Sequence, residues 1–281
     1  MTQSNPTFIS VIVTTYNWPE ALRMTLQSLA GQTDRHFEVI VADDGSGPPT
    51  AELVSAFAGS APIPVAYVWQ EDAGFRRAAI INKAIAESRG DYLIFVDGDC
   101  ILQPDFVSQH RALAAPRHLV TGSRILLGRR LSRRLLAGGT WSFKDFRRGV
   151  LWYRLTGDVS KITALFVRLP TSRLRNYNSF VWRRIKGCNL ACWKADAVSV
   201  AGFDESFVGW GGEDIDFVFR LQDSGVIRRS GTWATEVLHI WHPPADPSRA
   251  ECNGKIVRTR IEAARLRRRG RSDAKLGVEL R

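Results

Sequence analysis

Apolar, β-branched runs alternate with segments of helical spacing along the first part of the chain. Four runs have the length of strands and end in polar residues, at 8–17, 37–46, 64–72 and 91–100. Three segments between them carry apolar positions at helical spacing, at 18–32, 50–58 and 78–88. Because parallel strands are joined by helical crossovers, this alternation predicts an α/β fold with a mostly parallel sheet flanked by helices.

Polar and acidic side chains follow each of the four predicted strands. In strand order they are Thr14, Thr15, Tyr16 and Asn17, then Asp43 and Asp44, then Glu71 and Asp72, then Asp97 and Asp99. Open α/β sheets bind their ligands outside the carboxyl ends of the strands. We therefore expect one ligand site at this edge of the sheet.

The Asp-Gly-Asp segment 97–99 is the first candidate for metal chemistry. On a strand, residues two apart point to the same side, and Gly98 between them leaves room for a phosphate. Carboxylate oxygens suit a divalent cation, Mn²⁺ or Mg²⁺. His239 and His242 lie at the end of the last predicted strand, 235–241, and offer a further ligand. The pattern predicts a cation at Asp97 and Asp99 with one of these histidines.

Phosphate binding has no glycine-loop signature of the Walker or Rossmann type in this sequence. Arg76 and Arg77 offer charge-assisted contacts to a pyrophosphate instead. The alternative is that both arginines form a solvated helix start.

The run from Trp210 to Asp214, Trp-Gly-Gly-Glu-Asp, is the second candidate for chemistry. Gly211 and Gly212 allow backbone angles closed to other residues and a close approach of a ligand. The residues that follow predict a helix, so Glu213 and Asp214 come at its N-terminus, where the helix dipole favours ionised carboxylates. This is either a simple acidic helix start or an acid or base held against a ligand.

The net charge of +11 is unevenly distributed over the 281 residues. Residues 111–186 carry 18 Lys and Arg against 2 Asp and Glu, and residues 254–281 carry 10 against 3. The chain is thus an acidic frame, residues 1–110 and 187–253, with a basic insertion at 111–186 and a basic tail at 254–281. We expect a single domain over 1–253, with a nucleotide-binding half at 1–110 and an acceptor or catalytic half at 187–253.

Arginines alternate with Leu, Trp and Tyr at 123–186, which indicates a helical insertion, and 258–271 is helix-prone. Leu131, Leu135 and Leu136 beside arginines, with Trp152 and Tyr153 nearby, favour contact with an anionic membrane surface over a merely solvated surface. No run approaches the roughly 18 apolar residues of a membrane span. We expect a cytoplasmic protein, peripheral on the inner face of the cytoplasmic membrane.

The cysteines are too few for a disulfide framework, so reduced thiols are expected. Cys188 and Cys192 with His239 and His242 form a possible zinc site, although the segment between the two cysteines is typical of a buried strand.

Five of these segments, taken together and in order, resemble the glycosyltransferases of family 2, which have the GT-A fold. They are VIVTTYNWPEALRMTLQSLAGQ, VADDGS, QEDAGFRRAAIINKAI, DYLIFVDGDC and GWGGEDIDFVFRL. The last resembles the C-terminal part of β-1,4-galactosyltransferases and chondroitin-polymerase-like enzymes. The resemblance covers 1–110 and 187–242 and leaves out the basic insertion and tail. Ile81 departs from the family, where many members carry Arg.

The resemblance implies a metal-dependent, inverting transfer of a sugar from a nucleotide-sugar donor, expected to be UDP-linked, to a glycan or lipid-linked acceptor. Asp214 would be the general base, with Glu213 beside it. Trp210, Gly211 and Gly212 would contact acceptor or donor sugar. Asp99 would bind the metal, with His239 the better second ligand and His242 the alternative. The residues implied at the nucleotide are Thr15, Tyr16, Asn17, Asp43, Asp44, Asp72, Arg76 and Asp97.

Two other functions are compatible with parts of the sequence. A nucleotidyltransferase would use the same sheet and metal but release pyrophosphate. A nucleic-acid-binding protein would explain the pI of about 10.0 and the Arg-aromatic pattern at 141–184. It would leave the acidic strand ends without a role, because carboxylates repel a phosphate backbone.

Overall fold

The four predicted strands lie next to one another on one side of a larger main sheet. The computed structural model describes residues 5–138, 141–177 and 179–279, and in these residues seven strands run in the order β3-β2-β1-β4-β8-β6-β9. Their bounds are β1 Ile9–Thr15, β2 Phe37–Asp43, β3 Val65–Trp69, β4 Tyr92–Asp97, β6 His118–Thr121, β8 Asn189–Trp193 and β9 Ile227–Ser230. β1 to β4 are parallel, as predicted, whereas β8 is antiparallel to both β4 and β6.

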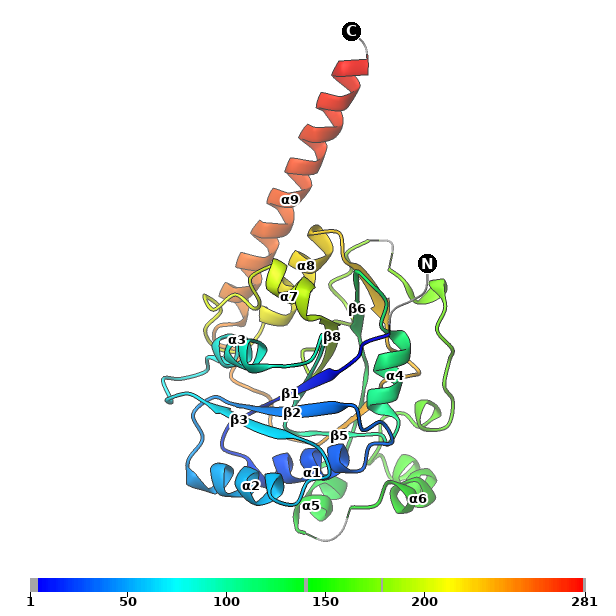
Figure 1. Cartoon of the computed structure of the whole chain (residues 1–281). Coiled ribbons are helices and arrows are strands. Elements are labelled where there is room, and N and C mark those ends of the chain that lie inside the picture. The colour runs from blue at the N-terminus through cyan, green and yellow to red at the C-terminus, as the bar shows by residue number, and fades with distance from the viewer. Residues whose placement is uncertain (1–4, 139–140, 178, 280–281) are drawn as a thin grey trace.

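Helices cover both faces of this sheet, because successive strand residues point to opposite sides. Val11 and Val13 share one core with α1 Pro19–Ala30, α2 Pro48–Ala58 and α4 Phe106–Leu113. Ile12 faces the opposite core, which is covered by α3 Arg77–Glu87, α7 Lys194–Ser199 and α8 Glu213–Asp223. Figure 1 shows α1 and α2 on one side of the sheet, with α3, α7 and α8 on the other. The α/β fold with a mostly parallel, helix-flanked sheet is confirmed.

A second, smaller sheet lies beside the main one. Among the described residues it contains three strands in the order β5-β10-β7, with bounds β5 Cys100–Leu102, β7 Arg124–Leu126 and β10 Val237–His239. β10 is the core of the strand predicted at 235–241, which thus joins this sheet and not the main one. Pairing of His239 with Cys100 brings the distal histidine next to the Asp-Gly-Asp turn.

The basic stretch is helical only in its first half. α5 Arg129–Leu136 and α6 Phe143–Leu155 form there, while the described residues between 156 and 188 hold two short 3₁₀ turns, Thr163–Leu165 and Arg173–Arg175. The predicted insertion at 111–186 also includes β6, a strand of the main sheet, so its start belongs to the frame. The division of 1–253 into two halves and an insertion stays a prediction.

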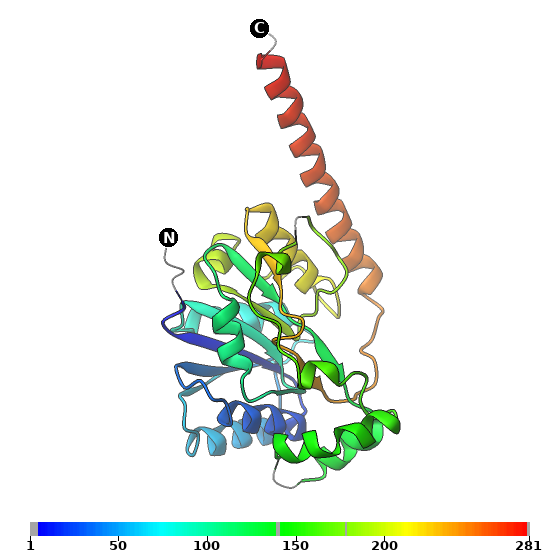
Figure 2. The same cartoon turned by 90° about the vertical axis from the view of Figure 1, so that its right-hand side faces the viewer.

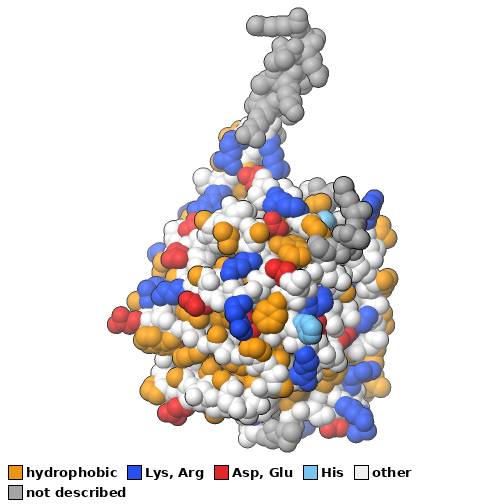
Figure 3. Space-filling view, in the orientation of Figure 1, with side chains coloured by type: hydrophobic (Ala, Val, Ile, Leu, Met, Phe, Trp, Pro, Cys, Tyr) orange, Lys and Arg blue, Asp and Glu red, His pale blue; other side chains and the backbone are white. Residues whose placement is uncertain are grey.

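The C-terminal segment forms one long helix, α9 Ala250–Glu279, as the sequence predicted for 258–271. Val257 and Ile261 pack on Phe207 and Phe219, which anchors the first turns. The helix then projects away from the body (Figures 1 and 2), with Lys and Arg side chains around its base (Figure 3). Residues 280 and 281 of the predicted tail lie outside the described residues. None of the described helices combines the length and hydrophobicity that crossing a membrane requires.

Candidate active site

The carboxyl ends of β1, β2 and β4 meet at one edge, as predicted. Thr15 pairs with Asp43 across β1 and β2, and Thr14 pairs with Asp97 across β1 and β4. The Thr14 hydroxyl donates a hydrogen bond to Asp97 over 2.9 Å. Parallel pairing in register therefore places polar ends of three strands side by side.

The two aspartates at the end of β2, Asp43 and Asp44, are buried and hydrogen-bonded. Asp43 accepts from the Tyr67 hydroxyl at 2.7 Å and from the Ser46 amide at 2.8 Å. Asp44 accepts from the Gln70 side chain at 2.5 Å and from the Arg76 amide at 2.7 Å. Burial raises the pKa of Asp44, although these two donors oppose the shift. Both carboxylates thus fix the turn after β2.

A more exposed rim lies next to these aspartates. The Tyr16 hydroxyl, on a side chain that is 52% exposed, donates to Asp72 over 2.9 Å. Asn17 accepts from the Gly47 amide and has a positive φ of 46°. Gly45 has a φ of +100°, and a Cβ there would come within 2.6 Å of the Asp72 Cα, so only glycine allows this approach. Tyr16, Asn17 and Asp72 are the exposed members of the predicted nucleotide set.

Arg77 joins three elements at the centre of the site. Its guanidinium donates to Asp97 over 2.8 Å and to the Gly187 carbonyl over 3.3 Å, and lies 3.5 Å from a Glu213 oxygen. The side chain is only 12% exposed. Arg77 therefore balances the charge of two predicted site carboxylates, and the expectation that it binds a pyrophosphate is not supported by this arrangement.

Arg76, at the N-cap of α3, has a different environment from Arg77. It is half-buried, its guanidinium donates to the Glu71 carbonyl, and its buried Nε lacks a partner among the described residues. An unpaired buried donor is unusual in a folded protein, but this atom is enclosed, so the pyrophosphate contact predicted for Arg76 stays a prediction.

Glycine geometry places the carboxylates of the Trp-Gly-Gly-Glu-Asp run. Gly211 and Gly212 have φ values of 98° and 101°, and α8 begins directly after them at Glu213. Asp214 is half-buried and accepts from the Ile215 amide over 2.8 Å, while Trp210 is 49% exposed at the surface. The predicted helix start is confirmed.

The sequence predicted that the helix N-terminus favours the ionised forms of Glu213 and Asp214. This prediction is wrong, because the pKa values of both carboxyl groups are raised. Burial, with the nearby charge of Asp214, raises the pKa of Glu213 to about 7, although Arg77 opposes the shift. Burial also raises the pKa of Asp214, again against Arg77. Desolvation outweighs the helix N-terminus here, because a dipole effect of roughly 0.3–1 kcal/mol is smaller than the cost of burying a charge.

Glu213→Gln should stabilise the fold at neutral and alkaline pH. The folded state binds the Glu213 proton more tightly, so stability falls as pH rises from the ordinary pKa of 4.5 to about 7. The variant removes this loss, and its gain over the parent should grow through that window to at most about 3 kcal/mol. Urea unfolding at several pH values measures it. Glu52→Gln, an exposed control, should show no pH-dependent gain, and an equal gain in both variants would contradict the assignment.

Asp99, His239 and His242 form a candidate metal centre. Their ligand atoms all lie within 4.8 Å of one another, with His239 Nε2 3.6 Å and His242 Nε2 3.3 Å from Asp99 Oδ2. The Pro243 carbonyl lies 2.6 Å from His242 Nδ1, which favours a proton on that nitrogen and leaves Nε2 free as a ligand. Burial lowers the pKa of His239 and so favours its neutral, ligating form. One carboxylate and two imidazoles suit Mn²⁺ or a similar cation.

The prediction that Asp97 and Asp99 lie on one strand and point to the same side is wrong. β4 ends at Asp97 and Asp99 lies in the turn before β5, so the alternation of a strand does not extend over both. Asp97 contacts Arg77 and Thr14, whereas Asp99 contacts the two histidines. The two carboxylates belong to adjoining parts of the site with different partners.

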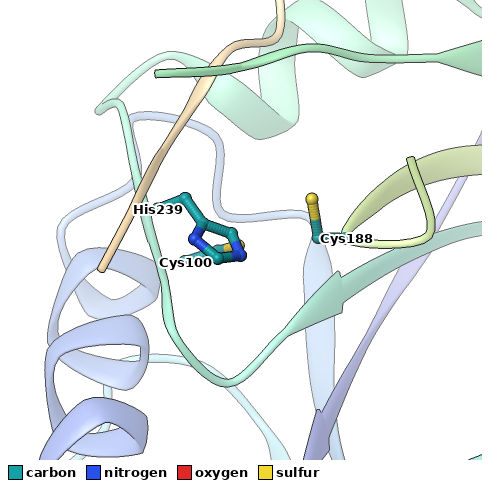
Figure 4. Close-up of side chains that lie close together, drawn as sticks. All are labelled: Cys100, Cys188 and His239. Atoms are coloured by element: carbon teal, nitrogen blue, oxygen red, sulfur yellow. The ribbon is translucent and has the colours of Figure 1, made fainter. Parts of the chain in front are cut away.

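The cysteines do not form the zinc site considered from the sequence. Cys188 and Cys192 belong to the two opposite cores of the main sheet. Cys188 lies instead beside Cys100 and His239, all three buried and with ligand atoms within 4.8 Å (Figure 4). Burial raises the pKa of the Cys100 thiol well above its ordinary value, which favours a protonated, structural role.

Three contributors to the site were not identified from the sequence. The Gly187 carbonyl accepts from Arg77, the guanidinium of Arg124 lies 3.3 Å from His239 Nε2, and the Trp18 ring meets His242 edge-on. Gly187 and Arg124 lie in the basic stretch or at its border, where no periodic pattern indicates which residues reach the sheet edge.

Comparison with family models gives two consecutive matches. Glycosyl transferase family 2 matches residues 10–169, and the model described as N-terminal domain of galactosyltransferase matches 172–243. The second match includes the Trp-Gly-Gly-Glu-Asp run and both histidines.

Relatives of the chain are longer than the chain itself. It is 30% identical over 248 residues to validoxylamine A glucosyltransferase of Streptomyces hygroscopicus subsp. jinggangensis, covering 84% of this chain and 57% of that protein. It is 29% identical over 236 residues to chondroitin synthase of Escherichia coli, covering 79% of this chain and 33% of that protein. The chain thus spans a little over half the length of the glucosyltransferase and about a third of the length of the synthase.

Solved structures share the fold at low identity. Mannosyltransferase PcManGT from Pyrobaculum calidifontis, in complex with GDP-Man and Mn²⁺, has a TM-score of 0.56 at 18% identity, covering 84% of this chain and 57% of that one. S. aureus TarS 1–349 in complex with UDP-GlcNAc has a TM-score of 0.57 at 17% identity, with coverages of 86% and 61%. With the family match over more than half of its length, this chain belongs to glycosyl transferase family 2.

Proposed function

We propose that the protein transfers a sugar from a nucleoside diphosphate sugar to a hydroxyl of a glycan or lipid-linked acceptor, with inversion at the anomeric carbon. The observation that carries the proposal is the position of Asp99, His239 and His242 at the same sheet edge as Glu213 and Asp214. Arg77 contacts both Glu213 and Asp97, and Asp97 lies two residues before Asp99 in the chain. A metal centre and a carboxylate pair, so connected, suit displacement of a diphosphate by a hydroxyl.

Asp214 is the proposed general base. An acceptor hydroxyl has a pKa far above 7, so a carboxylate must take its proton as the new bond forms. Glu213 is 7% exposed and lies beside Arg77, whereas Asp214 is half-buried and open to a ligand. Glu213 then positions Arg77, and the exposed Trp210 ring offers a flat surface to a sugar.

Several of the predicted nucleotide residues have distinct roles in this proposal. Tyr16 and Asp72 contact the nucleoside from the exposed rim, and Arg76, beside Asp44, adds positive charge at this edge. Asp43 and Asp44 hold the turn that presents this rim. Thr15, at the end of β1, and Asn17, in the adjacent loop, complete the set.

In this proposal a divalent cation balances the charge of the leaving group. Asp99, His239 and His242 would hold a divalent cation, and this donor set suits Mn²⁺ better than Mg²⁺. When bound, the cation supplies positive charge that stabilises the departing diphosphate. Relatives in solved structures carry GDP-Man with Mn²⁺ in one case and UDP-GlcNAc in another. They support a nucleotide-sugar donor and a divalent cation; UDP is the proposed nucleotide.

A panel of nucleotide sugars tests the proposal. The full chain with Mn²⁺ should slowly hydrolyse a subset of UDP and GDP sugars, because water can replace the acceptor, and the product should be the nucleoside diphosphate. Coupled detection of UDP and GDP measures this release. A parallel reaction with nucleoside triphosphates and sugar 1-phosphates tests the nucleotidyltransferase, which would release pyrophosphate from that mixture. Pyrophosphate there would favour the nucleotidyltransferase, and no nucleoside diphosphate from any donor would contradict the proposal.

A further inference from the structure

Helix α6 carries apolar side chains on both of its faces. Phe146 and Val150 are buried in the core next to the small sheet. On the outer side Leu151 and Trp152 are each 65% exposed and Leu155 is 82% exposed. A helix that only covers a soluble core has charged and polar residues at such positions. The outer face of α6 therefore has the composition of a contact surface.

Three basic side chains precede this apolar face along α6. Arg147 and Arg148 lie one turn before Leu151, and Lys144 lies one turn before Arg147 and Arg148; all three are exposed. Asp145, the acidic residue of α6, is paired with Arg148 at 3.0 Å. The face is thus apolar at its C-terminal end and cationic at its N-terminal end.

An open groove continues the surface toward Phe166. It has a volume of about 400 Å³ and is lined by Pro104, Phe143, Lys144, Arg147, Arg148 and Phe166. The Arg147 guanidinium lies 4.9 Å from the centroid of the Phe166 ring, which is 51% exposed. Apolar walls with cationic side chains at the rim suit an anionic headgroup attached to an acyl chain.

The neighbouring helix α5 adds charge but not apolar contact. Leu131 is 2% exposed, and Leu135 and Leu136 pack against the same core as Phe146. The membrane contact predicted for these leucines is therefore wrong. The four arginines of α5 are exposed: Arg129, Arg130, Arg133 and Arg134. Tyr153 of α6 is also turned inward, stacked on Phe146 at 5.8 Å.

We propose that the outer face of α6 docks on an anionic phospholipid bilayer. The α6 surface consists of Arg147, Arg148, Leu151, Trp152, Leu155 and Phe166. Its leucines and Trp152 enter the boundary between headgroups and acyl chains, and its arginines contact lipid phosphates. A second copy of the chain would bring two strongly cationic faces together, and a nucleic acid offers no apolar phase for the leucines.

Docking would place the metal centre next to the bilayer. The Ser132 hydroxyl of α5 accepts from the Trp241 amide over 2.9 Å, and the Arg129 guanidinium lies 5.0 Å from the centroid of the Trp241 ring. Trp241 lies between His239 and His242. Figure 2 shows α5 and α6, in green, together at one corner of the molecule. This consequence, that a lipid-linked acceptor reaches the site from the membrane, rests on the proposed function; docking itself does not.

Vesicle flotation of the full chain tests the proposal. The protein should float with phosphatidylcholine vesicles that contain phosphatidylglycerol and not with phosphatidylcholine alone. Leu151→Glu with Leu155→Glu should lower the ratio of bound to free protein by at least about tenfold. Arg147→Glu with Arg148→Glu should lower it about fivefold per residue and weaken its salt dependence. Val198→Glu is the matched control, an exposed apolar residue on α7.

Three results would overturn the proposal. They are no preference for the anionic vesicles, equal flotation of the leucine variant and the parent, and a dimer in analytical ultracentrifugation that the leucine variant abolishes. Donor hydrolysis without vesicles should be unchanged in all variants, which reports that they are folded. Flotation without any hydrolysis by the parent would reject the proposed function and leave the docking surface intact.

Discussion

Asp214→Asn should reduce sugar transfer by about a hundredfold to ten-thousandfold, the range that a positioned general base contributes. The amide has nearly the shape of the carboxylate and still accepts from the Ile215 amide, so the start of α8 should be preserved. Donor binding should change little, because the proposed contacts to nucleoside and cation come from other residues. Transfer rates at saturating donor, together with calorimetric titration of the donor, separate the two effects.

Asp223→Asn is a matched control for this variant. Asp223 lies on the same helix, at its last turn, where it pairs with Arg267 and Arg268 far from the sheet edge. It should keep the parent rate. Full transfer by Asp214→Asn together with loss of transfer in Glu213→Gln would assign the base to Glu213 instead.

The sequence predicted the first four strands because each carries a complete local signal. Val and Ile fill these strands, and polar residues end them, so both the element and its direction can be read locally. β6 contains four residues within the basic stretch and has no comparable signal. The reversed direction of β8 is also not encoded locally, since an antiparallel and a parallel buried strand have similar compositions.

The errors in the site arise from tertiary contacts. Arg77 resembles a phosphate-binding residue in sequence, but Asp97 and Glu213, distant along the chain, take up its charge. The leucines of α5 form a pattern that fits either a core or a membrane, and only packing against Phe146 decides between them. Desolvation of Glu213 depends on the whole surroundings of α8 and cannot be obtained from its position at a helix start.

Asp99→Asn should reduce Mn²⁺ affinity by more than about a hundredfold, because even residues that only orient metal ligands contribute roughly tenfold to a hundredfold. EDTA should stop transfer by the parent, and Mn²⁺ should restore it. His239→Ala and His242→Ala should each weaken Mn²⁺ binding, since both imidazoles lie within 4 Å of the Asp99 carboxylate. Titration of Mn²⁺ followed by electron paramagnetic resonance measures affinity independently of catalysis.

His36→Ala, an exposed histidine on the loop before β2, is the control for the histidine variants and should bind Mn²⁺ like the parent. If only one of His239→Ala and His242→Ala loses Mn²⁺ affinity, the histidine replaced in that variant is the sole imidazole ligand, because each variant keeps the other histidine. Unchanged transfer in EDTA would contradict the metal centre itself. In that case the charge on the departing diphosphate would have to be balanced by basic side chains. Arg124, 3.3 Å from His239, would then be the residue to substitute first.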